Sequence, residues 1–186
     1  MPENAVVVTG TFYHWAALKD REANFCPVNM GLCTAVALGL ALALPNRKVI
    51  ALDGDGNLLL NLSVLPDLAI QKPHNLIAIV FDNERLLSGG DMPSATAYGV
   101  DLEKIARGCG ITNAVTVRTL QDFQMTIRQA LAGDELAFIV AKVEPVWEAL
   151  PKSVIRDGKE VKYRFIRHIE VSEGKMILTP LAKKIS

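Results

Sequence analysis

Short apolar runs alternate along the chain with stretches of helical character, and this alternation limits the fold more than any other feature of the sequence. Strands are expected at Ala5–Val8, Lys48–Leu52, Leu76–Phe81, Ala114–Val117 and Leu136–Ala141. Helices are expected between them, at about Thr11–Lys19, Gly31–Leu44, Leu58–Gln71, Leu102–Gly108 and Leu120–Ala132. Strands that are apolar on both faces and joined by helices indicate a parallel sheet covered on both sides. The predicted fold is therefore α/β, with a doubly wound parallel sheet.

Several helix ends carry residues that favour those positions. Asp101 and Thr119 are expected N-caps, and Gly133 is expected to end the helix before it. The helix at Gly31–Leu44 is apolar on every side, with Thr34 as its polar residue. A helix of this kind is buried all round, in the core or against another subunit, and it is too short to span a bilayer.

The charge and the cysteines exclude several classes of protein. Twenty basic and twenty acidic residues cancel, and no cluster of Lys and Arg of the nucleic-acid-binding type is present. The three cysteines are scattered and form no CxxC motif, which fits a reducing compartment and argues against a zinc or iron–sulfur site. The first residues carry no cationic region of a secretory signal, so we expect a soluble, cytoplasmic protein.

The composition changes after residue 143, where Pro145, Pro151 and the Asp-Gly pair at 157–158 interrupt a polar tail. Apolar and polar residues alternate at Val161–Phe165, and a second apolar run follows at Lys175–Leu178, a pattern typical of two short antiparallel strands. We therefore expect one α/β domain at 1–143 and a short C-terminal arm at 144–186 that covers an edge or packs at an interface.

Two polar clusters follow the second and third expected strands. Asp55 lies directly after the second strand in the run DGDGN, and Asn83 lies 28 positions later, directly after the third. Open α/β sheets bind ligands at the carboxyl ends of their strands. Carboxylate and amide oxygens there suit Mg²⁺, which needs few protein ligands when phosphate and water supply the others. Gly54 and Gly56 would permit a tight turn and a close approach of the backbone to a phosphate.

The GDG motif, followed at this distance by Asp82-Asn83, resembles the signature of enzymes that depend on thiamine diphosphate (ThDP), where an asparagine pair occupies the second position. The resemblance covers about residues 25–143 and implies the diphosphate-binding (PP) domain of that family, with ThDP and Mg²⁺ as cofactors. An ordinary Asp-Gly turn is the alternative interpretation of Asp55.

The resemblance also implies roles for individual residues. Asp55 and Asn83 would ligate Mg²⁺ through their side chains and Arg85 through its carbonyl group, so that the metal bridges the two phosphates of the cofactor. The GDG turn and the backbone N–H groups of Gly56 and Asn57, at the start of the next helix, would bind the diphosphate.

A second segment, PVNMG at 27–31, resembles the family's loop of GSMG type before an alanine- and glycine-rich helix. In that loop a large apolar residue wedges under the cofactor and holds it bent, and Met30 occupies this position. The carbonyl group of Val28 would accept a hydrogen bond from the aminopyrimidine. Val28-Asn29 departs from the usual Gly-Ser, but the contact is made by the backbone. Packing in the core is the alternative role for Met30.

The family activates ThDP with a glutamate from a separate pyrimidine-binding (PYR) domain, for which this chain has no room. Its layout is most similar to the β subunits of sulfopyruvate decarboxylase and related phosphonopyruvate decarboxylases. The resemblance implies a 2-oxo acid decarboxylase that shares its site with a PYR-domain α subunit, in a hetero-oligomer with at least two copies of each chain. His14 and Ser88 are candidates to face the substrate, and for both a purely structural or loop role is the alternative.

Other functions stay open at this point. The chain could belong to a carboligase of the acetolactate synthase type, or it could be a non-catalytic ThDP-binding subunit. A flavodoxin-like nucleotide binder would share the fold but has no reason for the spacing of Asp55 and Asn83. A ferredoxin-linked oxidoreductase β subunit is disfavoured because cluster-binding cysteines are missing. The sequence does not identify the 2-oxo acid.

Overall fold

The computed structural model describes residues 2–10, 12–27, 29–86, 89–145 and 157–178, without the side chains of residues 12–14. Its main sheet has the strand order β2-β1-β3-β4-β8-β7, and every neighbouring pair in it is parallel. The strands are β1 (Val6–Thr9), β2 (Asn24–Phe25), β3 (Val49–Gly54), β4 (Leu76–Asp82), β7 (Ala114–Val117) and β8 (Ala137–Lys142). The five expected strands are confirmed. Strand β2 was not expected, because a strand of two residues is too short to show a sequence pattern.

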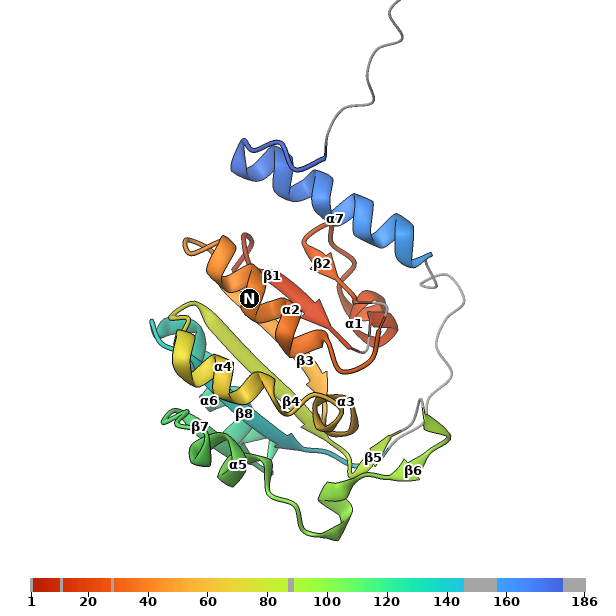
Figure 1. The fold of residues 1–186 in the computed structure, drawn as a ribbon, viewed down its shortest axis with the longest axis vertical. Helices are drawn as coiled ribbons and strands as arrows, with labels where there is room; N and C mark the ends of the chain where they lie inside the picture. Colours follow the sequence, from red (N-terminus) through yellow and green to blue (C-terminus); the bar gives the residue numbers. More distant parts are fainter. Residues whose placement is uncertain (1, 11, 28, 87–88, 146–156, 179–186) are drawn as a thin grey trace, which may run out of the picture.

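Helices cover both faces of the sheet, which confirms the doubly wound α/β fold (Figure 1). They are α1 (Phe12–Leu18), α2 (Cys33–Ala43), α3 (Asp55–Leu59), α4 (Val64–Gln71), α5 (Leu102–Gly108), α6 (Leu120–Ala132) and α7 (Gly158–Glu173). Helices α2, α4 and α5 pack on one face with Val6 and Val8 of β1, and α1 and α6 pack on the other with Val7. Side chains that alternate along β1 therefore enter two separate cores.

The expected helix ends are largely confirmed. The side chain of Asp101 accepts a hydrogen bond from the N–H of Lys104 at 3.0 Å, and Thr119 accepts from Asp122 at 3.1 Å. Gly133 follows the last residue of α6. The single helix expected at Leu58–Gln71 is wrong, because a turn at residues 60–63 separates α3 from α4.

Helix α2 is not buried all round in this chain. Its buried face consists of Cys33, Thr34, Ala37, Leu38 and Ala41, whereas Leu42 is 49% exposed. Burial of the outer face against another subunit, the second possibility raised by the sequence, stays a prediction. Within the described residues, no helix is long and apolar enough to cross a membrane.

The described part of the C-terminal arm consists mainly of helix α7, and the expected pair of antiparallel strands is wrong. Val161, Phe165 and Ile169 are spaced by four residues, lie on one side of α7 and are buried. Five residues were too few to distinguish period-two alternation from this helical spacing. The ring of Phe165 packs on that of Phe25 in β2, with 5.1 Å between ring centroids. The helix thus covers the edge of the sheet, as expected for the arm (Figure 1).

We expect Phe165→Ala to lower the free energy of unfolding by about 3 kcal/mol, because it removes a ring that is only 5% exposed and leaves a cavity beside β2. Tyr163→Ala on the same helix is the matched control, since Tyr163 is 55% exposed, and it should change stability by less than about 0.5 kcal/mol. Urea unfolding of both variants measures the difference. Equal losses would mean that α7 does not pack on β2.

Candidate functional site

The carboxyl ends of β3 and β4 form the centre of the candidate site. The two strands pair in register with Gly54 opposite Phe81, so the residues that follow them lie at the same edge of the sheet. Asp55 opens α3 directly after β3, and Asn83 follows β4. A hairpin of β5 (Arg85–Leu86) and β6 (Met92–Pro93), followed by the 3-10 helix η2 (Ala95–Tyr98), lies beyond this edge (Figure 1).

Asp55 is almost completely buried, with 1% of its surface exposed. Its Oδ2 atom accepts hydrogen bonds from Ser94 Oγ at 2.5 Å and Thr96 Oγ1 at 3.0 Å. Burial raises the pKa of Asp55, and the nearby charge of Asp82 adds to this, while the two hydroxyl groups partly counter it. The ionised carboxylate is therefore undercompensated, a condition that a bound cation would relieve.

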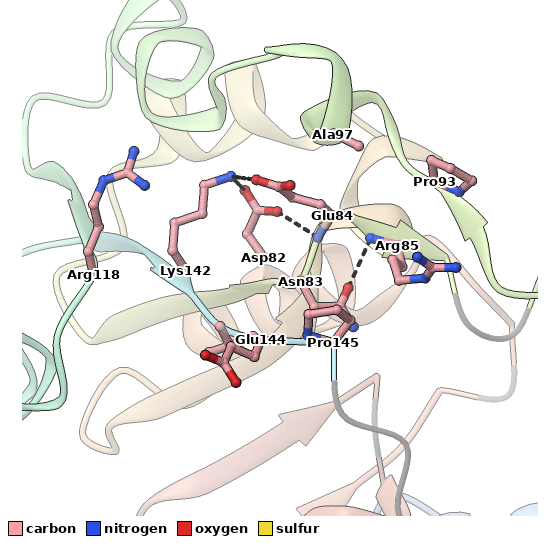
Figure 2. Close-up of a pocket in the computed structure, with 11 residues that line it drawn as sticks. Asp82, Asn83, Glu84, Arg85, Pro93, Ala97, Arg118, Lys142, Glu144 and Pro145 are labelled. Carbon is pink, nitrogen blue, oxygen red and sulfur yellow. Dashed lines mark hydrogen bonds and ion pairs between the residues drawn. The ribbon is translucent and has the colours of Figure 1, made fainter.

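Asp82, the last residue of β4, joins this network from the other side. Its Oδ1 atom is 2.8 Å from Thr96 Oγ1 and accepts from the N–H of Glu84 at 3.1 Å. Its Oδ2 atom pairs with Lys142 Nζ at 2.8 Å, and Lys142 also pairs with Glu84 at 2.9 Å (Figure 2). Burial alone would lower the pKa of Lys142, but the two carboxylates outweigh it and raise that pKa. Lys142 thus stays charged and holds the loop after β4.

The charges in this network fit a hard cation. Asp55, Asp82 and Glu84 contribute three carboxylates, against one ammonium group from Lys142. Thr96 contacts the carboxylates of both Asp55 and Asp82, but its single hydroxyl proton can be donated to only one at a time. A divalent cation bound to Asp55 would offset the excess negative charge.

The available ligands are oxygen atoms. Within the described residues, no group of three or more His, Cys, Asp and Glu side chains could hold a metal ion by itself. A metal here would therefore take its remaining ligands from amide, backbone, water or phosphate oxygens, which is how Mg²⁺ is usually bound.

Asn83 and Arg85 fix the start of the hairpin. Asn83 Oδ1 accepts a hydrogen bond from the N–H of Arg85 at 3.1 Å and keeps a second lone pair (Figure 2). The guanidinium group of Arg85 forms two hydrogen bonds with the carboxylate of Asp91, at 2.6 and 3.0 Å. The Arg85 side chain is thus occupied within the hairpin, and only its carbonyl group was expected to serve as a ligand.

A cavity of about 480 Å³ adjoins this loop (Figure 2). Asp82 lines it from the end of β4, Asn83 and Glu84 from the loop that follows, and Lys142 from the end of β8. Arg118, just after β7, adds a second cationic group to its wall. The cavity therefore opens at the carboxyl ends of three neighbouring strands, where open parallel sheets bind ligands.

The glycines of the motif differ from each other. The expected tight turn at Gly54 is not observed: the residue is extended, with φ of −112°, and a Cβ atom there would meet nothing closer than 4.0 Å. Gly56 lies in α3, and a Cβ atom there would approach Leu86 Cδ1 to 2.8 Å. Gly56 is therefore required for the packing of α3 against β5. The predicted contact of both glycines with a phosphate stays a prediction.

Asp53, for which the sequence indicated no role, organises the part of this edge that adjoins α2. It is buried and accepts hydrogen bonds from the N–H and hydroxyl groups of Thr34, at 3.2 and 2.6 Å. The N–H of Gly54 and the side chain of Asn57 donate to its other oxygen. Burial raises the pKa of Asp53 and these four hydrogen bonds counter the shift. Thr34 lies in the first turn of α2, so Asp53 ties α2 to β3.

The remaining expected residues divide into two groups. Met30 is 50% exposed, so it does not fill the core of this chain. His14 lies in α1, which begins at the carboxyl end of β1, but its side chain is outside the described residues. Val28 and Ser88 lie outside them altogether. The structure thus brings Asp55, Asn83, Gly56 and Asn57 to the same edge of the sheet. Their expected roles, like those of His14, Val28 and Ser88, stay predictions.

Comparisons with known proteins identify the family of this chain. Residues 9–141 match the family described as thiamine pyrophosphate enzyme, C-terminal TPP binding domain. The chain is 36% identical over 156 residues to sulfopyruvate decarboxylase subunit beta of Methanocaldococcus jannaschii. The matched residues make up 83% of this chain and 81% of the relative. It is 32% identical to phosphonopyruvate decarboxylase of Streptomyces viridochromogenes, covering 78% of this chain but only 37% of that protein.

The fold is also shared with a solved benzoylformate decarboxylase from Polynucleobacter necessarius. The two superpose with a TM-score of 0.66 at 22% identity, over 81% of this chain and 32% of that one. At this level of identity the likeness concerns the fold alone.

Proposed function

Since the chain belongs to the thiamine pyrophosphate (ThDP) enzymes, through their C-terminal TPP binding domain, we propose that it is the PP-domain subunit of a ThDP- and Mg²⁺-dependent 2-oxo acid decarboxylase. The observation that carries this proposal is that Asp55 and Asn83 follow two paired strands at the same edge of the sheet, where Asp55 belongs to a network with excess negative charge. Its α-subunit partner would carry the PYR domain, and the site would form between the two chains.

The residues of this chain would bind and shape the cofactor. Bound ThDP supplies the electron-accepting ring that allows a 2-oxo acid to lose CO₂. Asp55, Asn83 and the Arg85 carbonyl group would hold Mg²⁺ against the diphosphate. The backbone at Gly54, Gly56 and Asn57 would bind diphosphate oxygens. These groups neutralise and orient the anionic end of the cofactor, and transfer no proton themselves.

The opposite end of the cofactor would be held by the loop before α2. Met30, half exposed, would pack against the cofactor, and the Val28 carbonyl group would accept from its amino group. His14 and Ser88 are proposed to face the substrate.

The names of two relatives suggest the substrate class that we propose. Sulfopyruvate and phosphonopyruvate, 2-oxo acids with a strongly anionic substituent, are the proposed candidates, in line with the names of the two relatives.

Carboligation to an acetohydroxy acid is the second candidate function, since the same subunit architecture could capture a second carbonyl compound. The test is to supply the complete complex with ThDP, Mg²⁺ and each 2-oxo acid, and to measure CO₂, aldehyde and carboligation products. Lack of ThDP binding by the complex would refute the proposal.

We expect Met30→Ala to lower turnover at least about tenfold while changing the Kd for ThDP less than about threefold. The wedge would control the shape of the cofactor rather than its phosphate contacts, so its loss misplaces the reacting atoms more than it weakens binding. Met125→Ala is the matched control, because Met125 is 54% exposed on α6 and should have no effect on either quantity. Equal losses in affinity and turnover would contradict the wedge role.

A further inference from the structure

The backbone of Gly31, the residue after Met30, is held on both sides by asparagine side chains. Its N–H group donates to Asn57 Oδ1 at 2.6 Å, and its carbonyl group accepts from Asn61 Nδ2 at 3.1 Å. Gly31 has φ of +79°, and a Cβ atom there would lie 3.2 Å from Leu60 Cβ. Only glycine fits this conformation at such a close approach without strain.

The side chain of Asn57 is in turn oriented by Asp53. Asn57 Nδ2 donates to Asp53 Oδ1 at 2.5 Å, which leaves the amide oxygen directed to the Gly31 N–H group. Gly10 makes room for this contact, because a Cβ atom there would lie 3.0 Å from Asn57 Nδ2. A buried carboxylate, Asp53, thus sets which way the amide of Asn57 faces.

The position of Asn57 gives these contacts a consequence for cofactor binding. Asn57 lies in α3 two residues after Asp55. The helix that begins at Asp55 is therefore hydrogen-bonded to Gly31, the residue next to Met30. Two hydrogen bonds, each of 2.6 Å or less, link Asp53 of β3 to Asn57, and Asn57 to Gly31 in the loop before α2.

We propose that Asn57 and Asp53 are positioning residues that couple the two ends of the cofactor site: they lock the loop carrying Met30 to the segment carrying Asp55, so that the shape imposed on the cofactor depends on this lock. The inference rests on the proposed function for the role of Met30. The lock itself is a property of the chain and can be measured without a cofactor. Asn57→Ala removes the lock but keeps the backbone N–H group assigned to the diphosphate.

The first test is amide hydrogen exchange of the full chain without cofactor. Asn57→Ala should speed exchange at Gly31 by about tenfold, the effect of losing one hydrogen bond, and leave exchange at Val36 unchanged. Val36 is the internal reference because its N–H group donates to the carbonyl group of Leu32, the N-cap of α2, and not to an asparagine side chain. Asn75→Ala is the matched variant: it removes a buried amide that donates to Ala41 and Leu44, away from the site, and should spare Gly31. Unchanged exchange at Gly31 in Asn57→Ala overturns the lock.

The second test is a double-mutant cycle in the complete complex, with turnover and the Kd for ThDP as readouts. If Asn57 positions Met30, Met30→Ala should cost at least about tenfold in turnover in the wild type but less than about threefold in the Asn57→Ala background. Additive losses overturn the coupling, since a purely structural role of Asn57 predicts additivity. A wild-type complex that does not bind ThDP would refute the proposed function instead, and the exchange experiment would still decide on the lock.

Discussion

Asp55→Ala is expected to lower ThDP-dependent turnover of the complete complex by at least about 100-fold, because loss of residues that only support a metal ligand already costs 10- to 100-fold. The substitution removes the charged oxygen ligand that would link Mg²⁺ to the protein and so weakens the hold on the diphosphate. The Kd for ThDP, measured by calorimetry at fixed Mg²⁺, should rise with the loss of turnover.

The fold should survive this change. Burial raises the pKa of Asp55, which means that folding disfavours its ionised form and that removing the carboxylate relieves this cost. The hydroxyl oxygens of Ser94 and Thr96 are 2.8 Å apart, so the two hydroxyl groups can satisfy each other by hydrogen bonding when the Asp55 carboxylate is removed. Asp55→Asn, which keeps the shape of the side chain, separates loss of charge from loss of packing, and Asp67→Ala, at an exposed position, is the neutral control.

Asn83→Ala should lower turnover and ThDP affinity in the same way as Asp55→Ala, but less severely. Wild-type affinity and turnover in both ligand variants would show that the metal assignment is wrong.

The fold was predictable from the sequence wherever local pattern and tertiary structure agree. Strands β3, β4 and β8 are apolar on both faces because helices cover both sides of the sheet, so each appears as a continuous apolar run. The N-caps Asp101 and Thr119 could be located because capping is a contact over three residues. Helix α7 was missed because its apolar face is set by packing on β2, more than 130 residues away in the chain.

The candidate site was predictable only in its local part. Asp55 and Asn83 directly follow strands, so their placement depends on strand order alone. Ser94 and Thr96 reach Asp55 across 39 and 41 residues, through a hairpin whose two-residue strands carry no sequence pattern. Asp53 of β3 stood beside the motif in the sequence, but its role depends on Thr34 in α2. Long-range polar contacts of this kind leave no periodicity from which they could be inferred.

Several apolar side chains around the candidate wedge remain uncovered in this chain. Met30, Leu32 and Leu60 are exposed, and Leu60 lies beside Gly31. Leu42, near the other end of α2, is also exposed. Apolar groups gathered beside a binding site indicate a surface that another molecule covers. A PYR-domain chain that completes the cofactor site would have to approach from the side of Met30.

We therefore expect this polypeptide alone to be catalytically silent and to gain activity only with a PYR-domain partner. The relative from Methanocaldococcus jannaschii, of similar length, is named a β subunit, whereas the chain spans 37% of the phosphonopyruvate decarboxylase that it matches. The described residues form one parallel sheet with its helices and the helix α7, and we propose that a partner supplies the activating glutamate.

The measurement is CO₂ release from sulfopyruvate, phosphonopyruvate and pyruvate by the purified chain with ThDP and Mg²⁺, before and after addition of the PYR-domain chain. Turnover should stay at background before the addition and rise by orders of magnitude after it, with the mass of the active species corresponding to at least two copies of each chain. Met30→Glu, which places a charge on the exposed surface beside Gly31, should weaken assembly, whereas Met125→Glu on α6 should not. Robust turnover by the unaccompanied chain would refute the shared site, because every group needed for activation would then have to lie within these 186 residues.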